Sequence, residues 1–162
     1  SRPSNFELQR VNINECLKEA VEITKVGTKA KTIEFNVKLS DDIPNLPLVA
    51  DQLEQVFVNI LLNAVDAINE VTDEKKEKRI SIESALSKDE ASITFTDTGS
   101  GISEENLTKI FEPFFTTKSQ GRGTGLGLWV SYGIIKSFQG KLEVQSTAGL
   151  GTTFTIKLPV EK

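Results

Sequence analysis

The stretch of residues 51–70 constrains the fold more than any other part of the sequence. Its apolar side chains recur at intervals of three and four residues: Leu53, Val56, Phe57, Ile60, Leu61, Ala64, Val65 and Ile68. This spacing predicts a long helix with one apolar face. Such a face has to be buried against another layer, so we expect a layered domain built around this helix.

Other segments of the chain show strand and helix patterns that fit such a domain. Polar and apolar residues alternate over 33–39, 80–86, 91–97, 141–146 and 152–158, which predicts strands, and short strands are expected at 6–10 and 48–49. Helices are expected over 12–24, with Asn12 as N-cap, over 104–111 and over 126–138. Helices that alternate with mostly hairpin-linked strands favour a two-layer α/β sandwich. We expect a mixed, mostly antiparallel sheet with about three helices on one face.

The composition fits one soluble domain and argues against several classes of function. A chain of 162 residues can bury a sizeable core. Its net charge of −4 argues against nucleic-acid binding, and no apolar run reaches the roughly 20 residues needed to span a bilayer. The single cysteine, Cys16, cannot form an internal disulfide, which suits a reducing cytosol.

The chain contains no histidine and no methionine. Without histidine, it lacks the commonest general base and metal ligand, so any chemistry depends on other polar side chains or on a second domain. The absence of methionine, even at the first position, predicts a fragment of a longer chain or a processed product. We interpret residues 1–5 as the end of a linker and residues 6–162 as the domain.

A polar stripe formed by Asn59, Asn63 and Asp66 runs beside the apolar face of the long helix, within an arc of about 60°. Asn is a poor helix former, so two of them one turn apart need a reason. Their side chains can offer oxygens to a hard cation or amides to phosphate oxygens. Taken alone, the stripe is also explained as a solvated or cap-like polar edge.

Asp97 is in phase with Ile93 and Phe95, so it is expected on the core side of its strand. A carboxylate there is costly unless a partner satisfies it. One candidate partner is the exocyclic amine of a purine. The alternative is a turn in which the carboxylate accepts from the next backbone amides. Gly99 and Gly101 allow either a close approach by a flat ligand or a tight turn.

Residues 121–128 place four glycines at alternate positions directly before a predicted helix. Exposed N–H groups and the helix N-terminus make such a segment an anion site, and Lys118 and Arg122 add positive charge. The spacing is that of neither a P-loop nor a dinucleotide fingerprint. A flexible loop is the alternative.

Thr152 is a further polar residue expected to face the core. It is in phase with Phe154, Ile156 and Leu158, although β-propensity alone also explains a threonine there. Together, these features indicate a purine acceptor, an amide-lined cation site and a phosphate loop.

Five motifs occur in the order known from one family of proteins. Residues 51–68 resemble its Asn box, 97–102 its first Gly box, 111–118 its Phe box, 123–128 its second Gly box and 149–154 its last-strand signature. The chain thus resembles, over about 51–159, the catalytic, ATP-binding domain of bacterial sensor histidine kinases. That domain has the Bergerat (GHKL) fold of gyrase, Hsp90 and mismatch-repair ATPases.

The resemblance implies roles for the candidate residues. Asn63 would ligate Mg²⁺, and Asn59 would lie near the phosphates and help to orient them. Asp66 shares their stripe, but many members have a basic residue at its position. The phosphates would be held, beneath a lid of about 114–123, by Lys118, Arg122, Gly123, Thr124, Gly125, Leu126, Gly127 and Leu128.

The adenine would meet the Asp97 carboxylate through its amine. The rest of the base site would comprise Gly99, Gly101, Ile102, Leu126 and Thr152. Three phenylalanines would couple the lid to a partner domain: Phe111, Phe114 and Phe115.

The implied activity is transfer of the γ-phosphate of Mg²⁺–ATP to a histidine. Asn59, Lys118 and Arg122 would be catalytic through positioning and charge neutralisation. Because this chain has no histidine, the acceptor would lie in a separate dimerisation domain, and the isolated chain would not phosphorylate itself. A response regulator receiver domain would be the other partner. We expect a monomeric, cytoplasmic fragment of a membrane-anchored or soluble parent.

Three other functions remain open on the sequence: an ATP-driven clamp of the gyrase type, a non-catalytic nucleotide sensor or docking module, and a protein Ser kinase. Clamps have a Glu, and Ser kinases tend to have one, a turn before the metal-binding Asn, where this chain has Asn59.

Overall fold

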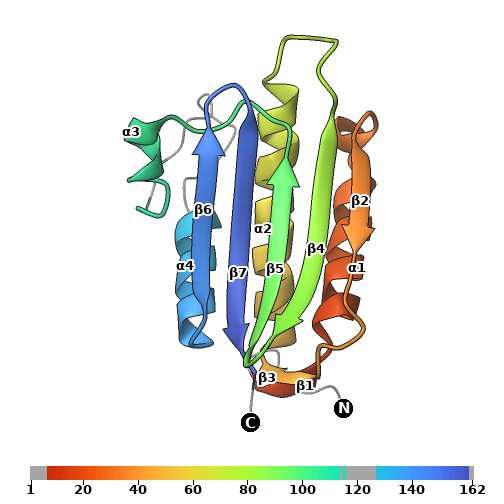
Figure 1. Ribbon diagram of the computed structural model, residues 1–162, viewed down its shortest axis with the longest axis vertical. Coiled ribbons are helices and arrows are strands. Elements are labelled where there is room, and N and C mark those ends of the chain that lie inside the picture. The colour runs from red at the N-terminus through yellow and green to blue at the C-terminus, as the bar shows by residue number, and fades with distance from the viewer. Residues whose placement is uncertain (1–6, 114, 116–126, 161–162) are drawn as a thin grey trace.

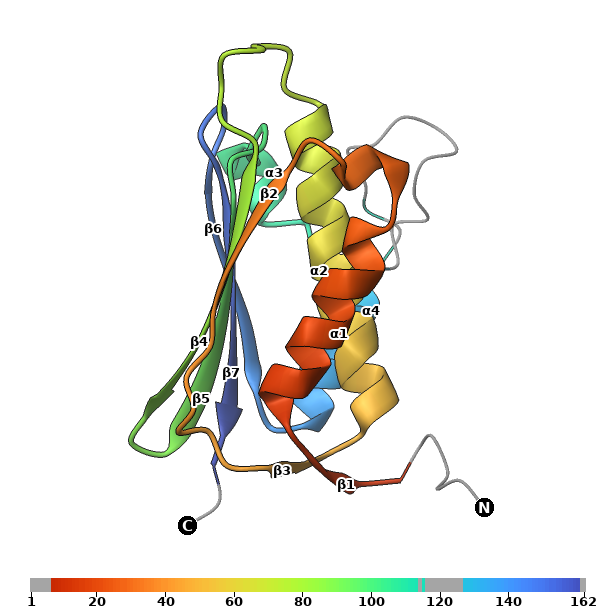
Figure 2. The same ribbon diagram turned by 90° about the vertical axis from the view of Figure 1, so that its right-hand side faces the viewer.

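Two layers make up the part of the chain that the computed structural model describes, residues 7–113, 115 and 127–160. One layer is a five-stranded sheet with the order β2-β4-β5-β7-β6 (Figure 1). Helices α1 (Ile13–Lys25), α2 (Ala50–Asn69) and α4 (Gly127–Ser137) cover one face of this sheet (Figure 2). The predicted two-layer α/β sandwich is confirmed.

The sheet is mixed, as expected. The neighbours β4 (Arg79–Ser87), β5 (Glu90–Asp97), β7 (Gly151–Pro159) and β6 (Lys141–Thr147) pair antiparallel, whereas β2 (Glu34–Lys38) runs parallel to β4. The alternation in 33–39 predicted a half-buried strand. That is true of Phe35, but Val37 is 39% exposed because β2 lies at the edge of the sheet.

Several predicted boundaries were wrong by a few residues. The short strands are β1 (Gln9–Val11) and β3 (Leu46–Leu48), which pair with each other in a separate small sheet. Helix α3 (Glu104–Leu107) is shorter than the predicted 104–111, because the chain continues as hydrogen-bonded turns. A 3₁₀ turn, η1 (Thr28–Ala30), follows α1. Pairing partners distant in sequence decide where a strand ends, so local patterns locate these ends poorly.

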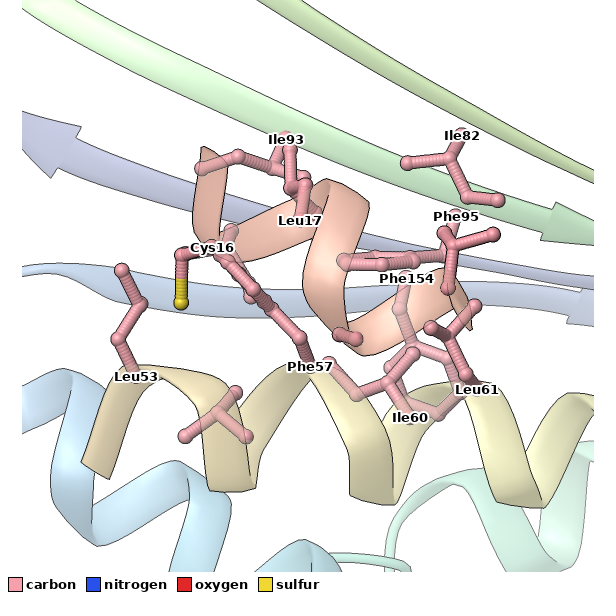
Figure 3. Packing of buried hydrophobic residues seen from close by; sticks show 14 of the residues in the cluster. Cys16, Leu17, Leu53, Phe57, Ile60, Leu61, Ile82, Ile93, Phe95 and Phe154 are labelled. Carbon is pink, nitrogen blue, oxygen red and sulfur yellow. The ribbon is translucent and has the colours of Figure 1, made fainter. Parts of the chain in front are cut away.

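The core lies between α2 and the sheet. All the apolar residues that predicted the long helix are buried. Figure 3 shows four of them, Leu53, Phe57, Ile60 and Leu61, among the core residues. Phe57 of α2 meets Phe95 of β5 with 5.8 Å between ring centroids and a tilt of 49° between the rings. No helix in the described part of the chain is long and apolar enough to cross a membrane.

Side-chain hydrogen bonds fix α1 against the sheet. Asn12 caps the helix as predicted, accepting from the Glu15 N–H at 3.1 Å. The buried Ser84 hydroxyl of β4 donates to Asn14 Oδ1 at 2.8 Å and accepts from the Ser40 N–H at 2.9 Å. One sheet residue therefore holds both the start of α1 and the segment after β2.

The carboxyl groups of Glu19 on α1 and Glu54 on α2 lie together between the two helices. Burial, reinforced by the charge of Glu19 and a hydrogen bond to it, raises the pKa of Glu54 above its ordinary value. Burial also raises the pKa of the nearby Cys16 thiol to about 12. Cys16 therefore stays protonated and behaves as a small apolar residue.

We expect Glu54→Gln to stabilise the fold at pH 7.5 by roughly 0.5 kcal/mol or less, or about 1–2 °C in melting temperature. A carboxyl whose pKa is raised by folding destabilises the folded state above that pKa. The gain should fade as the pH falls to the ordinary value of 4.5, which thermal melts across this range will measure. Glu22→Gln, at an exposed position of α1, is the matched control. Equal gains in both variants would contradict the assignment.

Candidate functional site

Asp97 ends β5 on the helix side of the sheet. It is only 6% exposed, and it shares this side with the buried residues Ile93 and Phe95, as the alternation predicted. The register places it opposite Thr152 of the neighbouring strand β7. Two polar residues predicted to face the core therefore lie side by side.

The Asp97 carboxylate is partly satisfied by the backbone. The Gly99 N–H donates to Oδ1 at 2.8 Å, so the turn considered from the sequence does form. Burial raises the pKa of Asp97 to about 6, against the opposing effects of the Gly99 and Thr152 backbone N–H groups and the Lys76 charge. A carboxylate offers about four acceptor positions, so capacity remains for a donor such as a purine amine.

Gly99 and Gly101 pass through narrow spaces between other parts of the protein. A Cβ on Gly99 would lie 2.6 Å from the Cβ of Ala67 on α2. Gly101 has a φ of +76°, and a Cβ there would lie 2.2 Å from the Thr147 carbonyl oxygen. At both glycines, the atoms that would collide with a side chain are atoms of the protein itself and not of a ligand. What these glycines permit directly is the packing of the 97–101 loop between α2 and β6.

A hydroxyl pair joins β6 and β7 beside Asp97. The Ser146 hydroxyl donates to the Gly151 carbonyl at 2.8 Å and accepts from the Ile102 N–H at 2.7 Å. It also lies 2.8 Å from the hydroxyl of Thr152, which is 4% exposed. Because Ser146 has only one hydroxyl proton, Thr152 is the donor in this pair, and its own oxygen keeps its acceptor capacity.

The polar stripe of α2 lies at the other side of the site. Asn59, Asn63 and Asp66 are all half-buried. The Asn59 amide donates to the Gly127 carbonyl at 3.5 Å and to the Ser131 hydroxyl at 3.4 Å, so it joins α2 to the first turn of α4. Asn59 is thus more than the solvated edge considered from the sequence.

The predicted residues of the phosphate loop fall into two groups. Lys118, Arg122, Gly123, Thr124, Gly125 and Leu126 lie outside the described residues, as does most of the predicted lid. Gly127 and Leu128 form the start of α4, whose predicted span of 126–138 is close to the observed one. A helix therefore follows the glycine-rich segment, as expected.

The two ends of the site are separated along α2. Asn59 contacts α4, whereas the Ala67 carbonyl accepts from the Ser100 N–H of the 97–101 loop at 3.0 Å. Asn59 and Ala67 are eight positions apart in the sequence, which is about 12 Å along the helix. Asn63 and Asp66 lie between them, so the site is elongated, with a buried carboxylate at one end and amides towards the other.

Some residues of this region escaped the sequence reasoning. Ser146 is in phase with the buried Leu142, so the alternation that identified Asp97 could have identified it too. Ser131, the fully buried partner of Asn59, stands one turn before the buried Ile135 in α4. Lys76 lies in a charged loop and gives no such signal.

The described residues contain no group of three or more His, Cys, Asp or Glu side chains that could hold a metal ion. A cation here would need fewer side-chain ligands, such as the Asn63 amide or the Asp66 carboxylate, together with oxygens of a ligand.

Comparison with known proteins agrees with this arrangement. A profile of the family described as "Histidine kinase-, DNA gyrase B-, and HSP90-like ATPase" matches residues 48–162, which is more than half of the chain. The chain belongs to this family. The matched range contains α2 with its polar stripe, the Asp97 loop and the β6–β7 pair. The family resemblance drawn from the motifs is confirmed.

Curated relatives within the family carry kinase names. Sporulation kinase E of Bacillus subtilis is 36% identical over 162 residues, all of this chain and 21% of its own length. Sensor histidine kinase ZraS of Escherichia coli is 34% identical over 98% of this chain and 32% of its own. Sensor kinase CckA of Brucella abortus is 41% identical over 80% of this chain and 15% of its own. The chain spans a third or less of each relative.

Solved structures share the fold. The catalytic domain of histidine kinase ThkA superposes with a TM-score of 0.78 at 28% identity, covering 95% of this chain and 96% of that one. The mycobacterial sensor histidine kinase MprB also gives a TM-score of 0.78, over 94% of this chain and 97% of that one. At 23% identity, MprB supports the fold alone.

We expect Gly101→Ala to destabilise the protein by about 2–4 kcal/mol, because it combines a left-handed backbone with a steric overlap. Urea unfolding will measure this loss. Gly133→Ala is the control, since Gly133 lies within α4 and an added Cβ would meet nothing within 4 Å beyond its own stretch of helix backbone. That change should be neutral or stabilise by up to about 1 kcal/mol. Similar effects of the two substitutions would show that the loop is not tightly packed.

Proposed function

We propose that this chain is the ATP-binding catalytic domain of a sensor histidine kinase. The observation that carries the proposal is the buried Asp97 carboxylate, which has spare acceptor capacity and lies at one end of an elongated site. Family membership and the names of the curated relatives support it. The domain would bind Mg²⁺–ATP and give up the γ-phosphate to a histidine on a separate dimerisation domain.

Adenine is proposed to bind at the Asp97 end. Its amine would donate to the carboxylate, and the Thr152 oxygen would accept a further hydrogen bond, directly or through water. Half-buried Ile102 offers an apolar contact to the base, with Leu126 proposed on its other side. The tight packing of Gly99 and Gly101 would hold this end rigid, which lowers the entropic cost of binding.

The phosphates are proposed to lie along α2 towards α4. Mg²⁺ would supply charge neutralisation there, held by the amide oxygen of Asn63 and by the phosphates, with Asp66 nearby. Asn59 would orient the phosphates while it holds α4 in place. The N-terminus of α4, with Gly127 and Leu128, favours anionic groups. The remaining phosphate contacts are proposed for Lys118, Arg122, Gly123, Thr124 and Gly125.

The acceptor is proposed to come from another domain. Phosphoryl transfer depends mainly on positioning and charge stabilisation, which amides and cations can supply. A phosphorylated histidine cannot form on a chain without histidine. We therefore propose a histidine-containing dimerisation domain as one partner and a response regulator receiver domain as the next, both in the cytoplasm.

We expect calorimetry to detect binding of ATP with Mg²⁺, and Asp97→Asn to weaken it by at least about tenfold, because a carboxylate accepts more strongly than an amide. Wild-type affinity should fall as the pH drops through about 6, where Asp97 gains a proton. ATP phosphate titrates in the same range. The difference between wild type and Asp97→Asn at each pH isolates the side chain, and exposed Asp41→Asn is the control. No binding at millimolar ATP would overturn the proposed function.

The isolated chain should acquire no acid-labile phosphate from ATP, and its hydrolysis of ATP should be very slow. The reason is the absence of an acceptor histidine and of a carboxylate at the position of Asn59 that could activate water. Incubation with radiolabelled ATP, followed by acid and base treatment, checks the first point. A rapid ATPase rate would instead favour a gyrase-type clamp.

A further inference from the structure

Lys76 occupies an unusual place beside the site. It belongs to the loop between α2 and β4 and is half-buried. Its ammonium nitrogen lies 2.9 Å from the carbonyl oxygen of Gly99 and 2.9 Å from that of Gly149. One belongs to the 97–101 loop and the other to the turn between β6 and β7. A single cation therefore joins two turns that are distant in sequence.

The same two turns meet through backbone hydrogen bonds. The Gly149 N–H donates to the Ser100 carbonyl at 2.7 Å, and the Ser100 N–H donates to the Ala67 carbonyl of α2 at 3.0 Å. The Ser100 hydroxyl donates to Glu70 Oε2 at 3.0 Å. Lys76 adds a further contact from the loop between α2 and β4. It donates to the carbonyl of Gly99, and the N–H of the same glycine donates to Asp97.

Lys76 also acts on Asp97 through its charge. Burial alone would raise the pKa of Asp97 further, and the Lys76 ammonium group opposes that effect. Near neutral pH it therefore favours the ionised carboxylate. The other charged side chains of the adjoining elements are Asp51, Glu54 and Asp66 on α2, Glu70 at its C-cap, Arg79 and Glu83 on β4, Glu90 on β5, Lys141 and Glu143 on β6, and Lys157 on β7. Arg79 pairs with Glu34 and Glu77, and Lys157 pairs with Glu143.

We propose that Lys76 is a positioning residue of the nucleotide site, which ties the Gly99 and Gly149 carbonyls together and, with its positive charge, holds the Asp97 carboxylate in place for the base. The inference rests on the proposed function, because Asp97 needs this placement only if it receives a ligand. Lys76 itself need not touch the nucleotide. Losing its charge should weaken binding most strongly at the acid end of the pH range.

The test compares wild type with Lys76→Met, Lys76→Arg and Lys75→Met. Met keeps the length and apolar stem of the side chain but removes the charge, whereas Arg keeps the charge. Lys75→Met removes the same charge from the adjacent, exposed position of the same loop. Melting curves establish that each variant folds, and calorimetry measures its affinity for ATP with Mg²⁺ at pH 7.5 and 6.5.

We expect Lys76→Met to weaken ATP binding by about threefold or more at pH 7.5 and by tenfold or more at pH 6.5, each relative to wild type at that pH. Lys76→Arg should restore most of the loss at pH 6.5, and Lys75→Met should change little. An equal loss at both pH values would mean that Lys76 only supports the loop mechanically. That result, or an equal loss in Lys75→Met, overturns the proposal.

A measurement without nucleotide separates this inference from the proposed function. Carbon NMR can follow the titration of the Asp97 carboxyl in the free protein, with a midpoint of about 6 expected in wild type. The midpoint should move to higher pH in Lys76→Met and stay in place in Lys75→Met. An unchanged midpoint in Lys76→Met overturns the inference even if ATP binds. A shifted midpoint without ATP binding refutes the proposed function and supports the action of Lys76 on Asp97.

Discussion

Burial of the apolar face of α2 against the sheet is the constraint on which the rest of the structure depends. The helix contributes eight buried side chains to the core, from Leu53 to Ile68. Its orientation is thereby set, and with it the direction of the polar stripe beside that face. The spacing of Asn59, Asn63 and Asp66 puts them on one edge of the helix, next to the buried apolar face. The same packing therefore organises both the core and the site.

Side chains alternate between the two faces of a strand, and this alternation made several residues of the candidate site predictable. Asp97 and Thr152 were expected to face inward because their apolar neighbours do, and both are buried. The alternation could not reveal that Asp97 and Thr152 lie opposite each other, because that depends on the register of β5 against β7. Ser146 follows the same alternation, but a serine also fits an exposed strand position at little cost, so its type does not mark it as a buried carboxylate is marked.

Contacts distant in sequence account for what could not be predicted. Lys76 lies 73 residues from Gly149, and nothing in its charged loop distinguishes it from Lys75 or Lys78 before the chain is folded. The parallel pairing of β2 with β4 and the small β1–β3 sheet are also long-range contacts between short segments. By contrast, the Asn12 cap and the main helices were predicted well because the interactions that define them are local.

The parallel pairing of β2 also bears on how large the folding unit is. The family profile begins at residue 48, yet α1 packs along α2 with Leu17 and Ala20 fully buried, and β2 completes the edge beside β4. A chain trimmed to the profile would expose the flank of α2 and leave the hydrogen-bonding groups of β4 unpaired along that side, a common start of aggregation. The segment that the family profile recognises is thus smaller than the packed unit, because α1 and β2, which precede it, cover the flank of α2 and the edge of β4.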